Sequence, residues 1–354
     1  LIVTFGEQKA KELYDEYSFF DKEVVYYPSK DVLFYQSDIR GNLLTAERIR
    51  ALKAIREQER VTLVTTFDAL MNTMAPIEKM WENVLTLEQG QLLDLKEIQA
   101  ALIRMGYEKE DQVQTMGQFS VRGGILDVFP LTEENPIRIE LWGDEIDTIR
   151  YFDCESQKSI ENIDRVSIYP AAELVLSDEE KAGGIEKLKA EAKRVSDKLR
   201  KQMKTEEAHR VTVMADELTE EWGELSMYAG MDAFLSYFFD ERVGLLDYFK
   251  PSDSLIFFDE LTRCTEQGKL TETEFSESMK QRLAMGYILP GQMNGLFTEK
   301  EIVAKLGKYS CIALGALDNK ANGLHQLGSY GIHCQSVSPY NNSFELLIKD
   351  LKRY

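Results

Sequence analysis

An alternation of short apolar strands with helical segments near the start of the chain restricts the fold more than any other feature of the sequence. Leu1–Phe5, Glu23–Tyr27 and Val61–Thr65 are apolar enough to form buried strands. Between them, Glu7–Phe20 and Thr45–Glu57 carry apolar residues at helical spacing. Strands that alternate with helices usually pair in parallel through crossover connections. We therefore expect an α/β domain built on a parallel sheet.

The pattern changes after about residue 86. A helix is predicted from Asp94 to Met105 and ends at Gly106. Short strands separated by Gly and Asn-Pro turns then follow, at Gln118–Val121, Ile125–Pro130, Ile137–Trp142 and Glu145–Asp153. This arrangement is typical of an antiparallel meander, and it predicts a smaller α+β domain inserted into the first.

Helical and strand patterns return after Ser177. Residues 185–207 are expected to form a charged helix with one apolar stripe. Leu255–Phe258 and Cys311–Leu314 are short apolar strands of the kind found in buried parallel sheets. We expect them to complete the first sheet. The predicted division is 1–88 (domain 1a), 89–175 (domain 2) and 176–354 (domain 1b).

Composition excludes several classes of protein. Leu1–Phe5 has the character of a strand already under way and not of a signal peptide, so we expect the chain to be a fragment of a longer protein. It has no apolar run of about 18 residues, so no membrane span is predicted. The formal net charge of −19 argues against strong binding of duplex DNA by the chain as a whole. It does not exclude contact with DNA through a local basic patch. Four cysteines without C-x-x-C spacing and three histidines predict no metal site and no disulfides.

One acidic pair resembles part of a nucleotide site. Asp259 and Glu260 follow the apolar strand Leu255–Phe258, where P-loop ATPases hold magnesium. The phosphate-binding loop G-x-x-x-x-G-K-[ST] is missing from these residues. A working site would need such a loop upstream of Leu1, so Asp259 and Glu260 are predicted to be a degenerate remnant. No catalytic set is recognised elsewhere.

The strand Ile137–Trp142 carries a candidate binding face. Arg138, Glu140 and Trp142 alternate with apolar residues and therefore share the outer side. Arg122, on the preceding strand, is placed to reach the same side. An exposed Trp beside Arg is typical of a binding hot spot. The alternative is a cross-strand salt bridge covered by the Trp stem.

Three stretches carry a family resemblance: Gly117–Pro130, Pro136–Ile146 and Tyr151–Asp153. They resemble the domain 2 signature shared by UvrB and the transcription-repair coupling factors of the Mfd family. Asp38–Leu52 resembles the Mfd version of this region, and the stretch from Pro339–Glu345 through Asp350–Lys352 is similar to the end of the module. The long β-hairpin of UvrB has no counterpart between Thr45 and Val61, and the missing P-loop also favours Mfd.

The resemblance implies a helicase-like, degenerate P-loop-type domain, split into 1a and 1b around an inserted domain 2. It implies a non-catalytic fragment without a cofactor that recruits UvrA to stalled RNA polymerase for nucleotide excision repair. The family's UvrA-contacting positions correspond to Arg122, Arg138, Glu140 and Trp142. The last of these is often another aromatic residue. The parent protein is implied to be a cytoplasmic, ATP-dependent DNA translocase whose ATP, Mg, RNA polymerase and duplex DNA sites lie outside this chain.

Two other interpretations stay open. The chain is alternatively a nucleotide-binding, UvrB-type ATPase half that uses Asp259 and Glu260. A third possibility is a module that binds or verifies damaged DNA directly.

Overall fold

The computed structural model describes residues 1–30, 42–224, 230–316, 323–332 and 343–352. The chain divides into two compact units, residues 1–324 and residues 325–354. In the second unit, helix α11 (Phe344–Leu351) has no buried residue. Asp38–Leu52 and Pro339–Glu345 lie partly outside the described residues, and His333 and Cys334 lie wholly outside them. No helix within the described ranges is both long and apolar enough to cross a bilayer.

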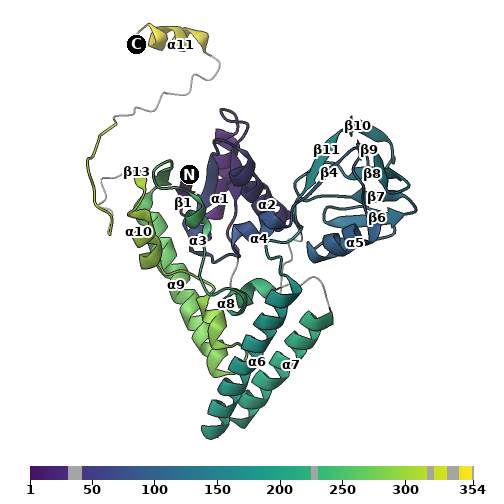
Figure 1. The fold of residues 1–354 in the computed structure, drawn as a ribbon. Helices are drawn as coiled ribbons and strands as arrows, with labels where there is room; N and C mark the ends of the chain where they lie inside the picture. The colour runs from purple at the N-terminus through teal and green to yellow at the C-terminus, as the bar shows by residue number, and fades with distance from the viewer. Residues whose placement is uncertain (31–41, 225–229, 317–322, 333–342, 353–354) are drawn as a thin grey trace. The chain divides into compact units, whose positions relative to one another are not determined.

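A five-stranded parallel sheet forms the first layer of unit 1 (Figure 1). Its order is β13-β12-β1-β3-β2. Of the strands that come late in the sequence, β12 pairs in parallel with β1 and β13 pairs in parallel with β12, so the prediction that they complete the first sheet is confirmed. The bounds are β1 (Ile2–Thr4), β2 (Val25–Tyr27), β3 (Leu63–Thr66), β12 (Leu255–Asp259) and β13 (Ser310–Leu314).

Helices accompany this sheet because their apolar stripes need a surface to cover. Ala10 of the first helix and Ile49 and Leu52 of the second are fully buried or nearly so. The helices are α1 (Glu7–Tyr17), α2 (Asn42–Glu57), α3 (Phe67–Met71), α4 (Ile77–Glu82), α9 (Leu261–Ala284) and α10 (Glu299–Leu306). Short 3-10 turns η1 (Met231–Phe234), η2 (Leu245–Tyr248) and η3 (Pro290–Asn294) connect the later elements.

A second, six-stranded sheet has the order β10-β9-β8-β7-β6-β5. Neighbouring strands from β6 to β10 are antiparallel, which confirms the predicted meander, and β5 joins its edge in parallel. The bounds are α5 (Leu95–Arg104), β5 (Glu108–Lys109), β6 (Gln118–Arg122), β7 (Ile125–Val128), β8 (Ile137–Trp142), β9 (Glu145–Phe152) and β10 (Ser159–Ile163).

A separate antiparallel pair joins β4 (Leu85–Glu88) to β11 (Arg165–Ile168). Backbone hydrogen bonds from Gly90 to Ile146 and from Leu93 to Asp144 tie the segment after β4 to the beginning of β9. Strand β4, which ends at Glu88, therefore pairs with β11 at the end of the inserted region. The domain boundaries at 88/89 and 175/176 stay a prediction.

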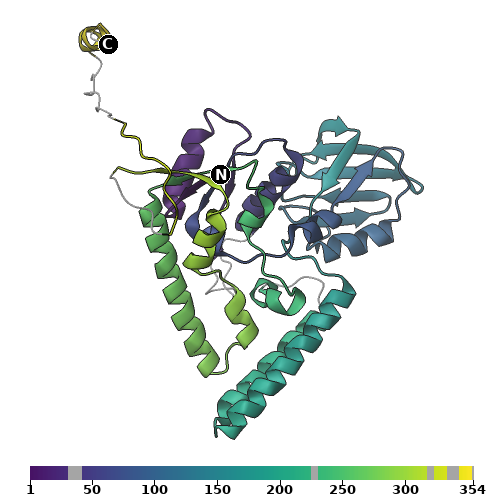
Figure 2. The ribbon, with the colours of Figure 1, turned by 60° about the vertical axis from the view of Figure 1, so that its left-hand side comes forward.

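The charged segment 185–207 is not one helix, contrary to expectation. Helix α6 (Asp178–Lys201) ends at a tight turn and α7 (Thr205–Glu224) returns beside it, as Figures 1 and 2 show. At the turn, Met203 adopts a left-handed φ of 63°, and the Lys204 N–H donates to the Leu199 carbonyl. This is a Schellman-type helix end without the usual glycine. Ser177 and Glu180 form a capping box at the start of α6, and α8 (Leu235–Phe238) packs on α6.

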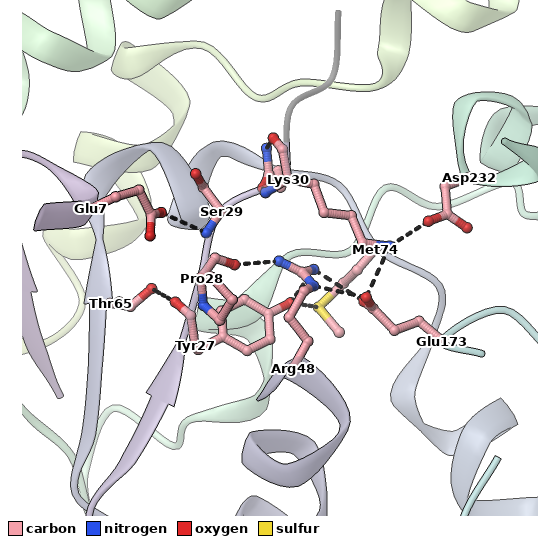
Figure 3. Close-up of polar contacts among 11 residues, drawn as sticks. Glu7, Tyr27, Pro28, Ser29, Lys30, Arg48, Thr65, Met74, Glu173 and Asp232 are labelled. Atoms are coloured by element: carbon pink, nitrogen blue, oxygen red, sulfur yellow. Dashed lines mark hydrogen bonds and ion pairs between the residues drawn. The ribbon is translucent and has the colours of Figure 1, made fainter. Parts of the chain in front are cut away.

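A buried ion cluster joins segments that are distant in sequence (Figure 3). Arg48 of α2 is fully buried, and its Nε and Nη2 donate to Glu173 at 2.7 and 3.0 Å. Its Nη1 donates to the Pro28 carbonyl at 2.7 Å. Lys30 bridges Glu173, at 2.8 Å, and Asp232 of η1. The cluster therefore holds the end of β2, helix α2, the segment after β11 and η1 together.

Candidate partner-binding surface

The face predicted on β8 exists, because the strand alternates as its sequence predicts. Ile137 and Ile139 are fully buried, whereas Trp142 is 85% exposed. Pairing with β7 and β9 sets the cross-strand neighbours: Asp127 and Arg150 lie on either side of Arg138. Side chains directly opposite each other in adjacent strands share one face. Polar side chains from three strands therefore gather on the outer side of the sheet.

Asp127 of β7 organises this face, and sequence reasoning missed it. Arg138 donates from Nε and Nη2 to its two carboxylate oxygens at 2.7 and 2.8 Å. Arg122 donates to the same carboxylate from Nη2 at 2.9 Å. The carboxylate is almost fully buried by these partners. The only signal in the sequence was a single acidic residue within the apolar strand Ile125–Val128.

Arg138 is mostly buried and is held by an ion pair with Asp127. Its side chain is 12% exposed, and its guanidinium lies 4.2 Å from the centre of the Phe152 ring. Nη2 also donates to Gln157 at 2.8 Å. The hydrogen bonds to Asp127 raise the pKa of Arg138 above its usual value. Arg138 thus stays charged and fixed in orientation.

Glu140 is held in a second ion pair. Arg150 Nη1 donates to its carboxylate at 2.9 Å, Nη2 makes a further short contact, and Thr148 adds a hydrogen bond at 3.2 Å. The hydrogen bonds from Arg150 lower the pKa of Glu140, although partial burial opposes this. Arg138 and Glu140 therefore each form a cross-strand salt bridge, with Asp127 and Arg150 respectively.

Trp142 is itself largely exposed. A register shift between Glu140 and Leu141 interrupts the pairing of β8 with β9, and Trp142 lies opposite Glu145 at the end of the strand. It borders a surface hollow of about 690 Å³. The hollow is lined by Glu88, Gln89, Gly90, Trp142, Glu145, Ile146, Asp147, Asp164 and Arg165.

The four predicted residues differ in exposure, which is 12% for the Arg138 side chain and 33% for the Glu140 side chain. Trp142 is 85% exposed and Arg122 is 49% exposed, whereas Arg138 and Glu140 hold the surface together. The structure brings Arg122 and Arg138 onto one carboxylate. A rigid face with one exposed aromatic and one half-exposed Arg can bind a protein surface by stacking and by charge-assisted hydrogen bonds.

Asp259 and Glu260 lie far from this face in sequence, at the carboxyl end of β12. The Thr4 hydroxyl donates to Asp259 at 3.1 Å, and the Ala316 N–H donates to Glu260 at 2.8 Å. Glu260 also has a left-handed φ of 59° at the start of α9. Both carboxylates thus bind neighbouring strand ends. Among the described residues, no group of three or more His, Cys, Asp and Glu side chains is arranged to hold a metal.

Comparison with known proteins identifies relatives along most of the chain. Residues 85–174 match the UvrB interaction domain family. The transcription-repair-coupling factor of Bacillus subtilis is 30% identical over 290 residues, which cover 81% of this chain and 24% of that protein. The factors of Staphylococcus epidermidis and Staphylococcus aureus strain MRSA252 are each 27% identical, over 94% and 100% of this chain. The chain spans 24% to 30% of the length of these relatives.

Proposed function

Because the chain is a homologue of transcription-repair-coupling factors and carries a UvrB interaction domain, we propose that it is the module with which such a factor recruits UvrA. The binding surface is the outer face of β8, with Trp142 and Arg122 as the contacting residues. The single observation that carries this proposal is the exposure of Trp142 on a face that buried ion pairs hold rigid.

Rigidity matters because a partner does not have to order this surface when it binds. Asp127 fixes Arg122 and Arg138, and Arg150 fixes Glu140. Ordering a flexible side chain at an interface costs about 0.5–1.5 kcal/mol, so a preformed face binds more tightly for the same contacts. Trp and Arg are also the residue types that most often dominate binding energies.

The rest of the proposed function concerns the longer protein. We propose that this fragment is non-catalytic and that its parallel sheet is a degenerate, helicase-like nucleotide fold. Asp259 and Glu260 would be remnants of the nucleotide site, and their hydrogen bonds to Thr4 and Ala316 support this. ATP-dependent translocation, and contact with RNA polymerase and duplex DNA in the cytoplasm, would belong to other parts of the parent protein.

Calorimetric titration of UvrA into the chain tests the proposal. Wild type is expected to bind, and Trp142→Ala is expected to weaken binding by about 30-fold, the equivalent of about 2 kcal/mol. Phe20→Ala is the matched control, because Phe20 is an 87% exposed aromatic after α1. Equal affinities for the two variants would contradict a role for Trp142. No binding by the wild-type chain would contradict the proposed function.

A further inference from the structure

The closed end of the α6–α7 hairpin is a concentrated positive region in an acidic chain. Between positions 193 and 204 the sequence has six cationic residues and one carboxylate, whereas the whole chain has 42 Lys and Arg against 61 Asp and Glu. All of these cationic residues are exposed. They are Lys193, Arg194, Lys198, Arg200, Lys201 and Lys204.

The helix dipole explains only some of these charges. Cations stabilise the last turn of a helix, which accounts for Lys198, Arg200 and Lys201. Lys193 lies before that turn and Lys204 lies after it, so neither serves this purpose. The acidic residues nearby do not neutralise the group. Glu191 approaches Arg194 at 3.6 Å and Asp197 approaches Arg200 at 4.0 Å, so two of the six cations have a long ion pair within α6, and Glu206 and Glu207 lie in the first turn of α7.

The spacing of the cations forms a stripe. Arg194, Lys198 and Lys201 follow one another at intervals of four and three residues, which places them on one side of α6. At a rise of 1.5 Å per residue the stripe is roughly 10 Å long. Successive phosphates of one DNA strand lie about 3.4 Å apart along the duplex axis, so the stripe matches about three of them.

Contacts from another part of the chain support the same end of the hairpin. Arg210 of α7 donates to the Met285 carbonyl, and its guanidinium lies 4.4 Å from the centre of the Tyr287 ring. Gly286 makes this approach possible: a Cβ there would lie 2.6 Å from the Glu207 carbonyl oxygen, and its φ is +73°. The hairpin end is thus braced against the segment after α9. Tyr287, under the Arg210 guanidinium, is an exposed aromatic.

We propose that the closed end of the α6–α7 hairpin binds the phosphate backbone of duplex DNA without sequence specificity. Flexible, separately exposed lysines fit repeated point charges such as phosphates. The high negative charge elsewhere would confine contact to this end. The site is separate from the β8 face and does not depend on UvrA binding.

Fluorescence anisotropy with a labelled duplex tests this inference on the 354-residue chain. The test variant is Lys198→Gln, Lys201→Gln and Lys204→Gln together. The control variant is Lys250→Gln, Lys300→Gln and Lys308→Gln, which changes three other exposed lysines and alters the net charge equally. Gln keeps helix propensity close to that of Lys.

Wild type and control are expected to bind with equal affinity and equal salt dependence. The slope of log affinity against log salt is negative, and in the test variant it should become less steep by about 2.7, because three phosphate contacts are lost. Equal slopes for test and control, or no salt-sensitive binding by wild type, would overturn the proposal. Loss of UvrA binding by the test variant with DNA binding unchanged would also overturn it, in favour of a protein partner.

Discussion

Arg138 and Asp127 lie directly opposite each other on β8 and β7, and two parallel hydrogen bonds of 2.7 and 2.8 Å join them. Asp127 is almost completely buried. A buried carboxylate that loses its main cationic partner keeps its desolvation cost without compensation. The predicted binding residue Arg138 is therefore also part of what keeps the face folded.

Arg138→Ala is expected to lower the free energy of unfolding by about 3 kcal/mol. Arg122→Ala should cost less than about 1 kcal/mol, because Arg122 is half-exposed and makes one hydrogen bond to Asp127. Urea denaturation of the two variants measures the difference. Similar stabilities would show that Asp127 does not depend on Arg138. A loss of partner binding by Arg138→Ala alone would not locate the binding site.

The Glu173 carboxyl should make the fold sensitive to acid. Burial alone would raise its pKa, but Arg48 and Lys30 outweigh burial and lower the pKa from 4.5 to about 2. A pKa lowered in the folded state stabilises the fold above pH 4.5, and the stabilisation is lost as the pH falls towards about 2. Its size at neutral pH is on the order of 3 kcal/mol.

Urea denaturation at a series of pH values measures this effect. Glu173→Gln should be less stable at neutral pH and should lose less stability than wild type between about pH 4.5 and about pH 2. Parallel pH profiles for the two proteins would show that Glu173 is not the group whose protonation weakens the fold.

Met203→Gly should stabilise the chain. Met203 adopts a left-handed φ of 63° at the end of α6, where a side chain costs roughly 1 kcal/mol and glycine does not. We expect the free energy of unfolding to rise by a net amount of roughly 0.5–1 kcal/mol. The greater entropy of glycine in the unfolded chain offsets part of the relieved strain. Met285→Gly is the matched control, because Met285 ends α9 with a φ of −89° and should gain nothing. A higher urea midpoint for the control than for Met203→Gly would contradict this account.

Local patterns in the sequence predicted most of the fold. Alternating apolar residues located β8 and its buried Ile137 and Ile139, and the short apolar runs located β12 and β13. The division of α6 from α7 was not predictable, because the turn at Met203 has neither Gly nor Pro. Local patterns carry no information on a left-handed residue of this kind.

Contacts over long sequence distances were also out of reach. Arg48 and Glu173 are 125 positions apart, and a charged residue in a helix predicts exposure and not burial. Asp127 was missed, because the pattern of β7 gives no reason to single out its one acidic residue. Only the register of β7 with β8 shows that it lies against Arg138. Sequence alone therefore indicated the face but did not separate its exposed residues from those that brace it.

The most direct test of the account is UvrA titration with Arg122→Ala/Trp142→Ala, because both side chains face solvent and neither is expected to hold the fold. We expect an unfolding midpoint close to that of wild type and a loss of UvrA affinity of roughly 100-fold or more. Unchanged affinity in this folded double variant would contradict the claim that the β8 face binds UvrA.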